Sequence, residues 1–317
     1  MRVATWTMAV ATIVSTGCAF QRTKEHMTMD TTKQDYADLW EFDNPAESGT
    51  RFKTELARVA PDSEAALQLT TQIARTHSLR RQFAEAHALL DTVEAKLPTS
   101  TPKIRVRYAL ERGRTFNSAG DKARAKALFL SAWEEANATG LDYYAIDAAH
   151  MMAFVTPPAE QHAWNERALA LTERTPDQRA KSWLVSLYNN IGWTYHDERD
   201  YQAALAMFGK ALAAAEAQGK PMPIRIARWT VARCLRSLGR YDEALRGQIA
   251  LRDAPKLDGA NDGYVYEEIG ENLVALNRGG EAQPNFARAY ALLKDDKTMQ
   301  ANEAARLERM RMLGGVR

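Results

Sequence analysis

The sequence is short of the residues that mark several protein classes. Its 317 residues include two cysteines, Cys18 and Cys234, and one pair at this spacing gives neither a disulfide framework nor a zinc pattern. Eleven prolines and 17 glycines are too few for a fibrous or disordered chain. Runs of β-branched residues are scarce, whereas Ala, Leu, Arg and Glu dominate. We therefore expect a globular protein that is helical almost throughout.

The sequence also lacks a large excess of either charge. Lys and Arg total 42 against 40 for Asp and Glu, so the formal net charge is only +2. A general nucleic-acid binder usually carries a stronger positive excess, so such a partner would depend on local basic patches. The two candidate patches are residues 103–114 and 225–240. We regard a regulatory protein that binds nucleic acid there as a less favoured alternative.

No pattern of catalytic or metal-binding residues stands out. The six histidines include no H-x-x-x-H pair, and the nucleophile elbow, the phosphate-binding loop and the dinucleotide fingerprint are missing. We therefore expect no enzyme activity, no catalytic residues, no metal site and no cofactor.

The N-terminal stretch "MRVATWTMAVATIVSTGCAF" allows two interpretations. One basic residue precedes about a dozen mostly apolar residues and Gly17-Cys18, which resembles a secretory signal that ends in a bacterial lipoprotein box. Cys18 would then be lipidated and would anchor an exported protein to a membrane. Thr5, Thr7 and Thr12 weaken the apolar core, and the alternative is an untidy leader with the true start at Met27 or Met29. We predict a cytoplasmic protein, with export through Cys18 as the alternative.

An internal repeat explains most of the remaining sequence. In "NNIGWTYHDERDYQAALAMFGKAL" (residues 189–212), Gly192, Tyr195, Ala204, Phe208 and Ala211 fall at positions 8, 11, 20, 24 and 27 of a helix-turn-helix unit. The same types recur at Gly113, Phe116, Ala125, Phe129 and Ala132, and at Gly270, Leu273, Ala282, Phe286 and Ala289. The alanines of position 20 are residues 86, 125, 163, 204, 244 and 282, which gives spacings of 39, 38, 41, 40 and 38 residues.

These positions resemble the signature of the tetratricopeptide repeat over roughly residues 35–296. The resemblance implies an all-α fold, a right-handed α-α superhelix, with about six helix-turn-helix units, a degenerate N-terminal half unit and a C-terminal cap helix. We divide the chain into a leader (1–30), a degenerate helical unit (31–62), a repeat domain (63–296), and a cap helix with a tail (297–317). In the half unit, "QDYADLWEF" would form a short first helix, and Phe52 would occupy position 24.

The family resemblance also implies a binding surface. In tetratricopeptide repeats the first helices line a concave groove, where positions 2, 5, 9 and 12 commonly contact ligand. Carried over to this sequence, those positions give the candidate groove residues Arg75, Arg107, Arg114, Asn117, Asn189, Trp193, His196, Trp229, Arg233, Arg236, Glu267 and Glu271.

One expected helix gives this surface a chemical character. On a helix with 100° per residue, Arg228, Trp229, Arg233 and Arg236 share one face, opposite the apolar face of Cys234. Arginines on a helix face often only contact solvent, but these coincide with the expected groove. Guanidinium groups around an indole suit an anionic, partly apolar peptide.

The sequence therefore predicts a non-enzymatic scaffold that binds a protein or peptide of acidic character in this groove. An exported lipoprotein that assists the assembly of an envelope complex is one alternative, and the nucleic-acid-associated regulator is the other. A membrane contact is expected only if Cys18 is lipidated.

Overall fold

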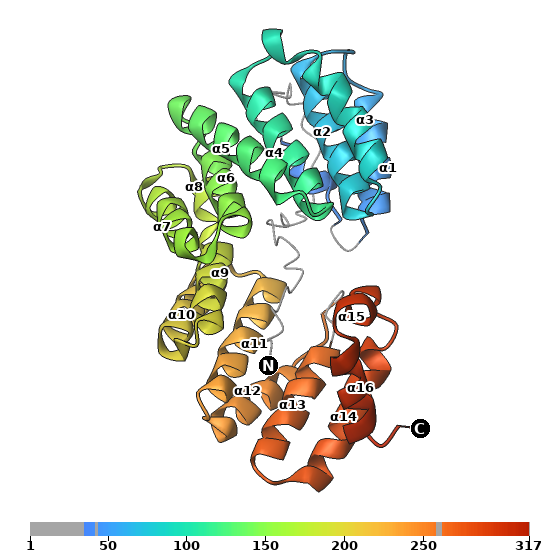
Figure 1. Ribbon diagram of the computed structural model, residues 1–317, viewed down its shortest axis with the longest axis vertical. Helices are drawn as coiled ribbons and strands as arrows, with labels where there is room; N and C mark the ends of the chain where they lie inside the picture. The colour runs from blue at the N-terminus through green and yellow to red at the C-terminus, as the bar shows by residue number, and fades with distance from the viewer. Residues whose placement is uncertain (1–34, 42–43, 258–261, 317) are drawn as a thin grey trace, which may run out of the picture. The chain divides into compact units, whose positions relative to one another are not determined.

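A computed structural model of the protein describes residues 35–41, 44–257 and 262–316. This part of the chain consists of helices and contains no strand. It divides into two compact bodies, which separate between Trp183 and Leu184 and are described individually (Figure 1). Cys18 and the predicted leader lie outside the described residues.

The N-terminal body contains three helix pairs and a half pair. Its elements are η1 (Ala37–Leu39), α1 (Pro45–Leu56), α2 (Glu64–Leu79), α3 (Phe83–Glu94), η2 (Leu97–Thr99), α4 (Pro102–Ser118), α5 (Lys122–Ala138), α6 (Asp142–Val155), α7 (Pro158–Arg174) and α8 (Gln178–Lys181). The pairs are α2 with α3, α4 with α5, and α6 with α7, as the repeat predicts.

The C-terminal body contains three more pairs. Its elements are α9 (Leu184–Asp197), α10 (Tyr201–Gln218), α11 (Pro221–Ser237), α12 (Tyr241–Asp253), α13 (Gly263–Ala275), α14 (Gly279–Leu293), α15 (Lys297–Asn302) and α16 (Ala304–Leu313). The segment predicted as one cap helix is divided into two, because Glu303, with φ −131° and ψ 29°, lies outside the helical region and separates α15 from α16.

Short turns set the geometry of each pair. Five of the six pairs are joined by three residues, and the middle one has a left-handed backbone conformation. These middle residues are Arg81, Gly120, Arg199, Gly239 and Asn277, with φ between 60° and 93°. Glycine adopts this conformation without strain, whereas arginine does not. The turn fixes how closely the second helix of a pair folds back on the first.

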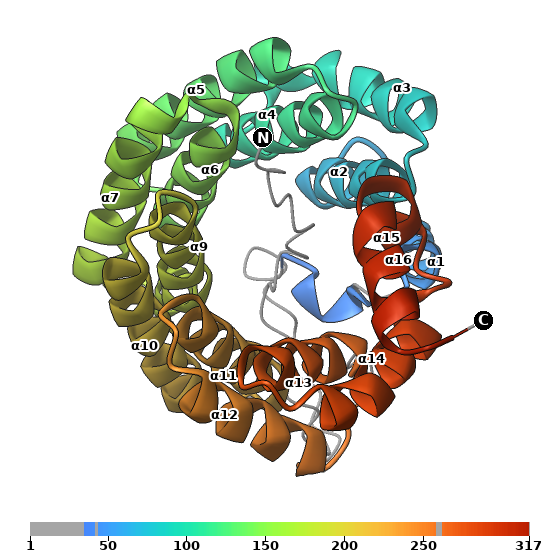
Figure 2. The ribbon, with the colours of Figure 1, turned by 60° about the horizontal axis from the view of Figure 1, so that its bottom comes forward.

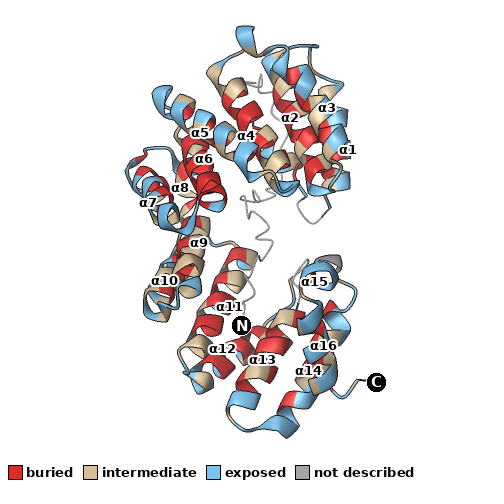
Figure 3. Cartoon of the chain, in the orientation of Figure 1, coloured by how far each residue is buried: buried red, intermediate tan, exposed pale blue. Residues whose placement is uncertain are grey.

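Glycine and phenylalanine fill the space between paired helices. The ring of Phe208 lies so close to Gly192 that a Cβ atom added there would lie 2.5 Å from Cε1 of the ring. Gly113 meets Phe129 in the same way, at 2.5 Å, and Gly270 meets Phe286, at 2.9 Å. All three phenylalanines are buried. Buried positions recur along the paired helices of both bodies (Figure 3). Positions 8 and 24 of the repeat therefore serve the packing predicted for them.

The third repeat departs from the predicted register. Ala163 was expected at position 20, but it is exposed, and the neighbouring Trp164 is buried instead. Phe154 falls at position 11 when counted back from Ala163, but it is 40% exposed, whereas Val155 is buried. In both helices, the residue that is buried follows the expected one by one place in the sequence. The turn of this pair has only two residues, between α6 and α7, and the prolines at 157 and 158 fix where α7 begins.

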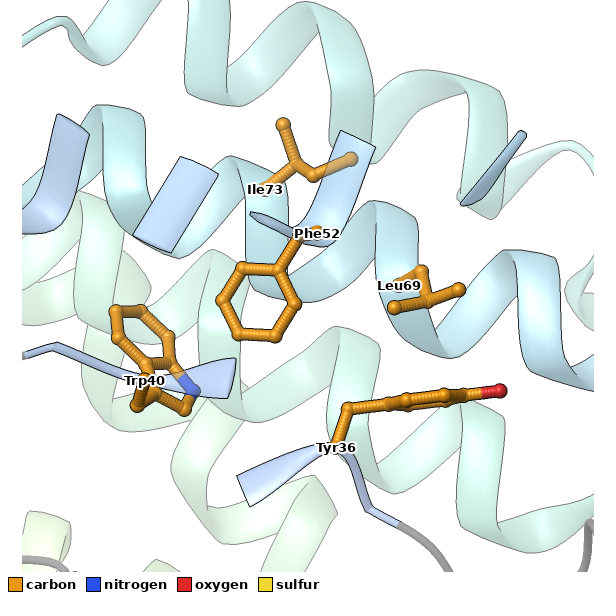
Figure 4. Packing of buried hydrophobic residues seen from close by; sticks show 5 residues of the cluster. All are labelled: Tyr36, Trp40, Phe52, Leu69 and Ile73. Atoms are coloured by element: carbon orange, nitrogen blue, oxygen red, sulfur yellow. The ribbon is translucent and has the colours of Figure 1, made fainter. Parts of the chain in front are cut away.

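The half unit is built from α1 and an incomplete first helix. The stretch that the sequence predicts as a short helix forms only a single 3-10 turn, η1. Its flanking aromatics, Tyr36 and Trp40, nevertheless pack on Phe52 of α1 and on α2 (Figure 4). Phe52 is fully buried, as position 24 requires.

The helices of each body form two layers. In the N-terminal body α2, α4 and α6 form a first-helix layer, and α3, α5 and α7 form a second layer (Figure 2). In the C-terminal body α9, α11 and α13 form the first-helix layer, and α10, α12 and α14 the second. Among the described helices, none is both long and apolar enough to cross a membrane.

Candidate functional site

All twelve candidate groove residues lie on first helices. Four are on α2 and α4 of the N-terminal body, and eight are on α9, α11 and α13 of the C-terminal body. The two sets belong to different bodies and are therefore considered as two surfaces.

A ladder of ion pairs links the first helices of the N-terminal body. Arg75 on α2 pairs with Glu111 on α4 at 3.2 Å, and Glu111 also pairs with Arg114 at 2.8 Å. Arg114 continues the ladder to Asp147 on α6. Burial opposes the ionisation of Glu111, but Arg114 and Arg75 hold its pKa below the usual range. The ladder therefore stays charged at neutral pH and neutralises two of the candidate arginines.

Arg107 on α4 is the most deeply buried of the N-terminal candidates. It is 5% exposed, and its Nη1 donates to the hydroxyl of Tyr144 on α6 at 3.0 Å. The same nitrogen lies 3.7 Å from the carboxylate of Asp35, which precedes η1. Asn117, near the end of α4, is half-buried.

A second ladder links the first helices of the C-terminal body to α16. Arg236 on α11 donates to both carboxylate oxygens of Glu268 on α13, at 2.7 and 3.0 Å. Arg233 joins the same carboxylate at 3.0 Å, and Glu268 is only 1% exposed. Two further pairs join α13 to α16: Glu267 with Arg306, and Glu271 with Arg309. Arg233 and Arg236 of α11 are thus paired with a carboxylate inside the protein.

Aromatic rings lie in a row across the same helices. The centroid of Trp193 on α9 lies 6.5 Å from that of Trp229 on α11, and Trp229 lies 6.4 Å from Tyr264 on α13. Trp193 and Tyr264 are half-buried, whereas Trp229 is buried and its indole N–H donates to the backbone oxygen of Tyr264 at 3.4 Å. We call these three residues the aromatic row. Neighbouring first helices thus present ring edges and faces at a regular spacing.

Polar side chains flank the aromatic row on α9. His196 forms a hydrogen bond between its Nε2 and the hydroxyl of Ser237 at 2.9 Å. Burial and the charges of Arg233 and Arg236 lower its pKa to about 4, so the ring is neutral at pH 7. Asn189, one turn before Trp193, has a buried side-chain oxygen without a hydrogen-bond partner among the described residues.

Sequence reasoning missed the carboxylates that pair with the candidate arginines. Glu111, Asp147 and Glu268 were not predicted, although a signal was present. The paired residues lie about one repeat apart, since Arg75 and Glu111 are separated by 36 residues and Arg236 and Glu268 by 32. A search for opposite charges at that separation would have found both ladders.

The described residues offer no clear site for metal or covalent chemistry. No group of three or more His, Cys, Asp or Glu side chains in this part of the chain could hold a metal ion. Cys234 is buried, its thiol donates to the backbone oxygen of Tyr201 at 3.3 Å, and burial raises its pKa to about 11. The thiol is therefore protonated and unreactive at neutral pH.

The two basic patches are also internally paired. Each Lys or Arg at positions 103, 105, 107, 112 and 114 has a carboxylate partner, as does each at 225, 228, 233, 236 and 240. Paired guanidinium groups have little net field to attract phosphates.

Comparison with known proteins agrees with the helix pairs. The tetratricopeptide repeat model matches residues 184–217, which cover α9 and all but the last residue of α10. No curated protein sequence matches the chain. Among solved structures, the apo form of RapI covers 89% of this chain and 80% of its own, with a TM-score of 0.66 at 13% identity.

Two further structures show the same fold. NprR in complex with its cognate peptide NprX covers 84% of this chain and 79% of its own, with a TM-score of 0.55 at 16% identity. A tetratricopeptide repeat protein from Parabacteroides merdae covers 88% and 94%, with a TM-score of 0.51 at 11% identity. The predicted all-α solenoid is confirmed, and the predicted repeat type is confirmed for residues 184–217.

Proposed function

We propose that this protein, a solenoid of tetratricopeptide-type helix pairs, is a non-enzymatic scaffold that binds an extended peptide segment of a partner. The observation that carries the proposal is the aromatic row of Trp193, Trp229 and Tyr264. Two of its rings are partly exposed, and rigid rings supply a large contact area at a small cost in side-chain entropy. A row with one ring per helix suits an extended chain that crosses the helices.

The polar group beside the row supports the same proposal. Asn189 and Trp193 are four residues apart on α9 and therefore share a face of the helix. A buried oxygen without a partner is costly, and a bound peptide N–H would satisfy it. The amide group would then fix the register of the bound segment, while the rings supply the affinity.

Related folds give the proposal a precedent. NprR is bound to a cognate peptide in its solved structure. Its fold, and not its sequence, is shared with this chain, so the identity of the ligand does not transfer.

The ion-pair ladders modify the predicted character of the contact. Arg233 and Arg236 already have a carboxylate partner, so an acidic ligand would have to compete with Glu268 for them. We therefore assign the affinity on the C-terminal body mainly to the rings. A few such contacts reach micromolar binding, about −8 kcal/mol, once ordering costs are subtracted. The partner is thus transient, and an acidic partner is better suited to the N-terminal body.

The nucleic-acid alternative is less well supported than peptide binding, because the cations of its two patches pair with internal carboxylates. Lys103 and Arg107 differ from the others in that they share Asp35 with a third cation, Arg179. We retain a cytoplasmic location as our proposal. Mass spectrometry of the mature N-terminus distinguishes it from export, because a lipid on Cys18 would place the protein at a membrane.

Peptide selection tests the proposed function while the natural partner is unidentified. The immobilised full chain is presented with random peptides displayed on phage, in parallel with the Trp193→Ala and Trp133→Ala variants. Trp133 is the matched control, since it is half-buried on α5 in a second layer. Peptides enriched by the wild type should bind Trp193→Ala about tenfold more weakly, a loss of about 1.4 kcal/mol, and Trp133→Ala equally well. The proposal would be refuted if the wild type enriched no peptide, or if Trp193→Ala and Trp133→Ala lost the same amount of affinity.

A further inference from the structure

The segment Asp35–Glu41 lies along the first-helix layer of the N-terminal body. It precedes α1, contains only the 3-10 turn Ala37–Leu39, and lies on the concave side of this body (Figure 2). Its side chains reach α1, α2, α4 and α8, which together span the body. The chain thus places a short segment of its own on the layer where the proposed function expects a peptide to bind.

The first anchor of the segment is a carboxylate. Asp35 is 8% exposed and lies among three cations: its Oδ1 is 2.8 Å from Nζ of Lys103, Nη1 of Arg107 is 3.7 Å away, and Arg179 on α8 pairs with Oδ2. We call Lys103, Arg107 and Arg179 the cation site. Residues from α4 and α8, more than one repeat apart in sequence, converge on this one side chain.

The cation site carries more charge than Asp35 neutralises. Three cations contact Asp35. Glu64 lies near Lys103, and Glu111 lies near Arg107 but already pairs with Arg75 and Arg114. Nε and Nη2 of the buried Arg107 have no hydrogen-bond partner among the described residues. Tyrosines hold two of the cations, since Arg107 donates to the Tyr144 hydroxyl and Arg179 lies 3.6 Å from the ring centroid of Tyr143. Burial lowers the pKa of Arg179 to about 10, but the group stays charged at neutral pH. Such a site favours further acidic groups.

The second anchor is a pair of aromatic rings. Tyr36 and Trp40 pack on Phe52, Leu69 and Ile73 (Figure 4). The indole N–H of Trp40 donates to Oε1 of Gln72 at 2.9 Å, and the guanidinium of Arg75 lies 5.9 Å from the indole ring centroid. The segment is therefore recognised through an acidic residue and two rings, as a peptide ligand would be.

The backbone between the anchors is strained. Tyr36 has a left-handed conformation, with φ 53° and ψ 28°, which a residue with a Cβ atom rarely adopts. The contacts on both sides of Tyr36 hold it there.

We propose that the cation site and the adjacent apolar surface of α2 form a binding site for a partner segment with an acidic residue followed by aromatic residues. The chain's own Asp35–Trp40 segment occupies this site and competes with that partner. This proposal deepens the proposed function, on which it rests, by naming the ligand chemistry of one surface and the competitor that controls access to it.

A competition experiment on the full chain tests the proposal. The probe is the fluorescent peptide Asp-Tyr-Ala-Asp-Leu-Trp-Glu, which repeats residues 35–41, and fluorescence anisotropy measures its affinity. A tethered competitor acts at about millimolar effective concentration, so the wild type should bind the probe weakly. Asp35→Ala should bind it about tenfold more tightly, and Asp35→Ala/Trp40→Ala more tightly still, because each change releases one anchor of the competitor.

Two controls separate recognition from mere loosening of the fold. A probe with Asn in place of its first Asp should lose about tenfold in affinity for Asp35→Ala, and so should the normal probe for Asp35→Ala/Arg179→Ala. Thermal unfolding of each variant identifies any that fail to fold. The proposal would be overturned if wild type, Asp35→Ala and Asp35→Ala/Trp40→Ala bound the probe with equal affinity. It would also be overturned if the probe with Asn bound Asp35→Ala as tightly as the normal probe. Neither outcome affects peptide binding at Trp193, so the failure of this inference and that of the proposed function are distinguishable.

Discussion

Arg236 and Glu268 form a doubly hydrogen-bonded ion pair between neighbouring repeats, with N–O distances of 2.7 and 3.0 Å. The carboxylate is buried and also forms an ion pair with Arg233. One acidic side chain therefore joins α13 to two arginines of α11. The candidate arginines of the C-terminal body are therefore part of the contact between repeats. The same arrangement recurs in the N-terminal body, where Glu111 joins Arg75 to Arg114.

Removal of the Glu268 charge should destabilise the C-terminal body. Glu268→Gln leaves two arginines without their common counter-ion, and breaking such a buried pair costs about 3 kcal/mol. Glu243→Gln is the matched control, because Glu243 pairs with Arg240 at 2.7 Å on the surface, and we expect no measurable change there. Urea denaturation followed by circular dichroism measures both. Equal midpoints for the two variants would show that the ladder contributes nothing.

A methyl group at Gly192 should test the contact between paired helices. The added Cβ would lie 2.5 Å from Phe208, so the ring must move, and overpacking of this kind costs about 1–3 kcal/mol. Gly209 is exposed on α10, and a Cβ atom added there would meet no atom of another residue within 4 Å beyond its own helix backbone and chain neighbours. Gly209→Ala should therefore stabilise the protein by up to about 1 kcal/mol. Thermal melting compares the two variants. A stabilising Gly192→Ala would contradict the close approach of α9 and α10.

The turns between paired helices contain a correctable strain. Arg199 has a φ of 66° in the position that Gly239 occupies, with a φ of 74°, in the next repeat. Arg199→Gly should raise the free energy of unfolding by about 0.5 kcal/mol, after the greater freedom of glycine in the unfolded chain is subtracted. Gly239→Ala should lower it by about 1 kcal/mol. If both changes acted in the same direction, the left-handed assignment of these turns would be wrong.

Acid should weaken the C-terminal body through His196. Its pKa falls from 6.5 in the unfolded chain to about 4, so between these values the unfolded state binds more protons and stability falls with decreasing pH. The full shift would correspond to about 3 kcal/mol, and solvent at the half-buried ring reduces this to about 1 kcal/mol. His196→Gln should flatten the decline in melting temperature from pH 6.5 to 4. An unchanged slope would assign the decline to other groups.

The sequence predicted the stacking of the helix pairs well because packing positions repeat. Gly192 and Phe208 are constrained by a neighbouring helix at a fixed separation, and that constraint leaves the same residue types in each repeat. The register failed at Ala163, where a two-residue turn before Pro158 replaces the usual three.

The site was predicted less completely than the fold. A helical face shows that Arg233 and Arg236 point the same way, but not that Glu268 of the next repeat meets them. Nor does periodicity reveal that Asp35, from a stretch expected to be an ordinary first helix, would insert between Lys103 and Arg179. The ion pairs of Glu268 and of Asp35 join segments that are far apart in the sequence, and the repeat length gives that sequence separation only approximately.

Hydrogen exchange with a bound peptide tests the central claim most directly, namely that partners bind on the first-helix layers. The peptide that the wild type selects most strongly is added at saturation, and amide exchange is compared with and without it by mass spectrometry. We predict slower exchange in α9, α11 and α13, or in α2, α4 and α6 for acidic-aromatic peptides, with little change in the second layers. Protection confined to α10, α12 and α14, or to α3, α5 and α7, would contradict the account.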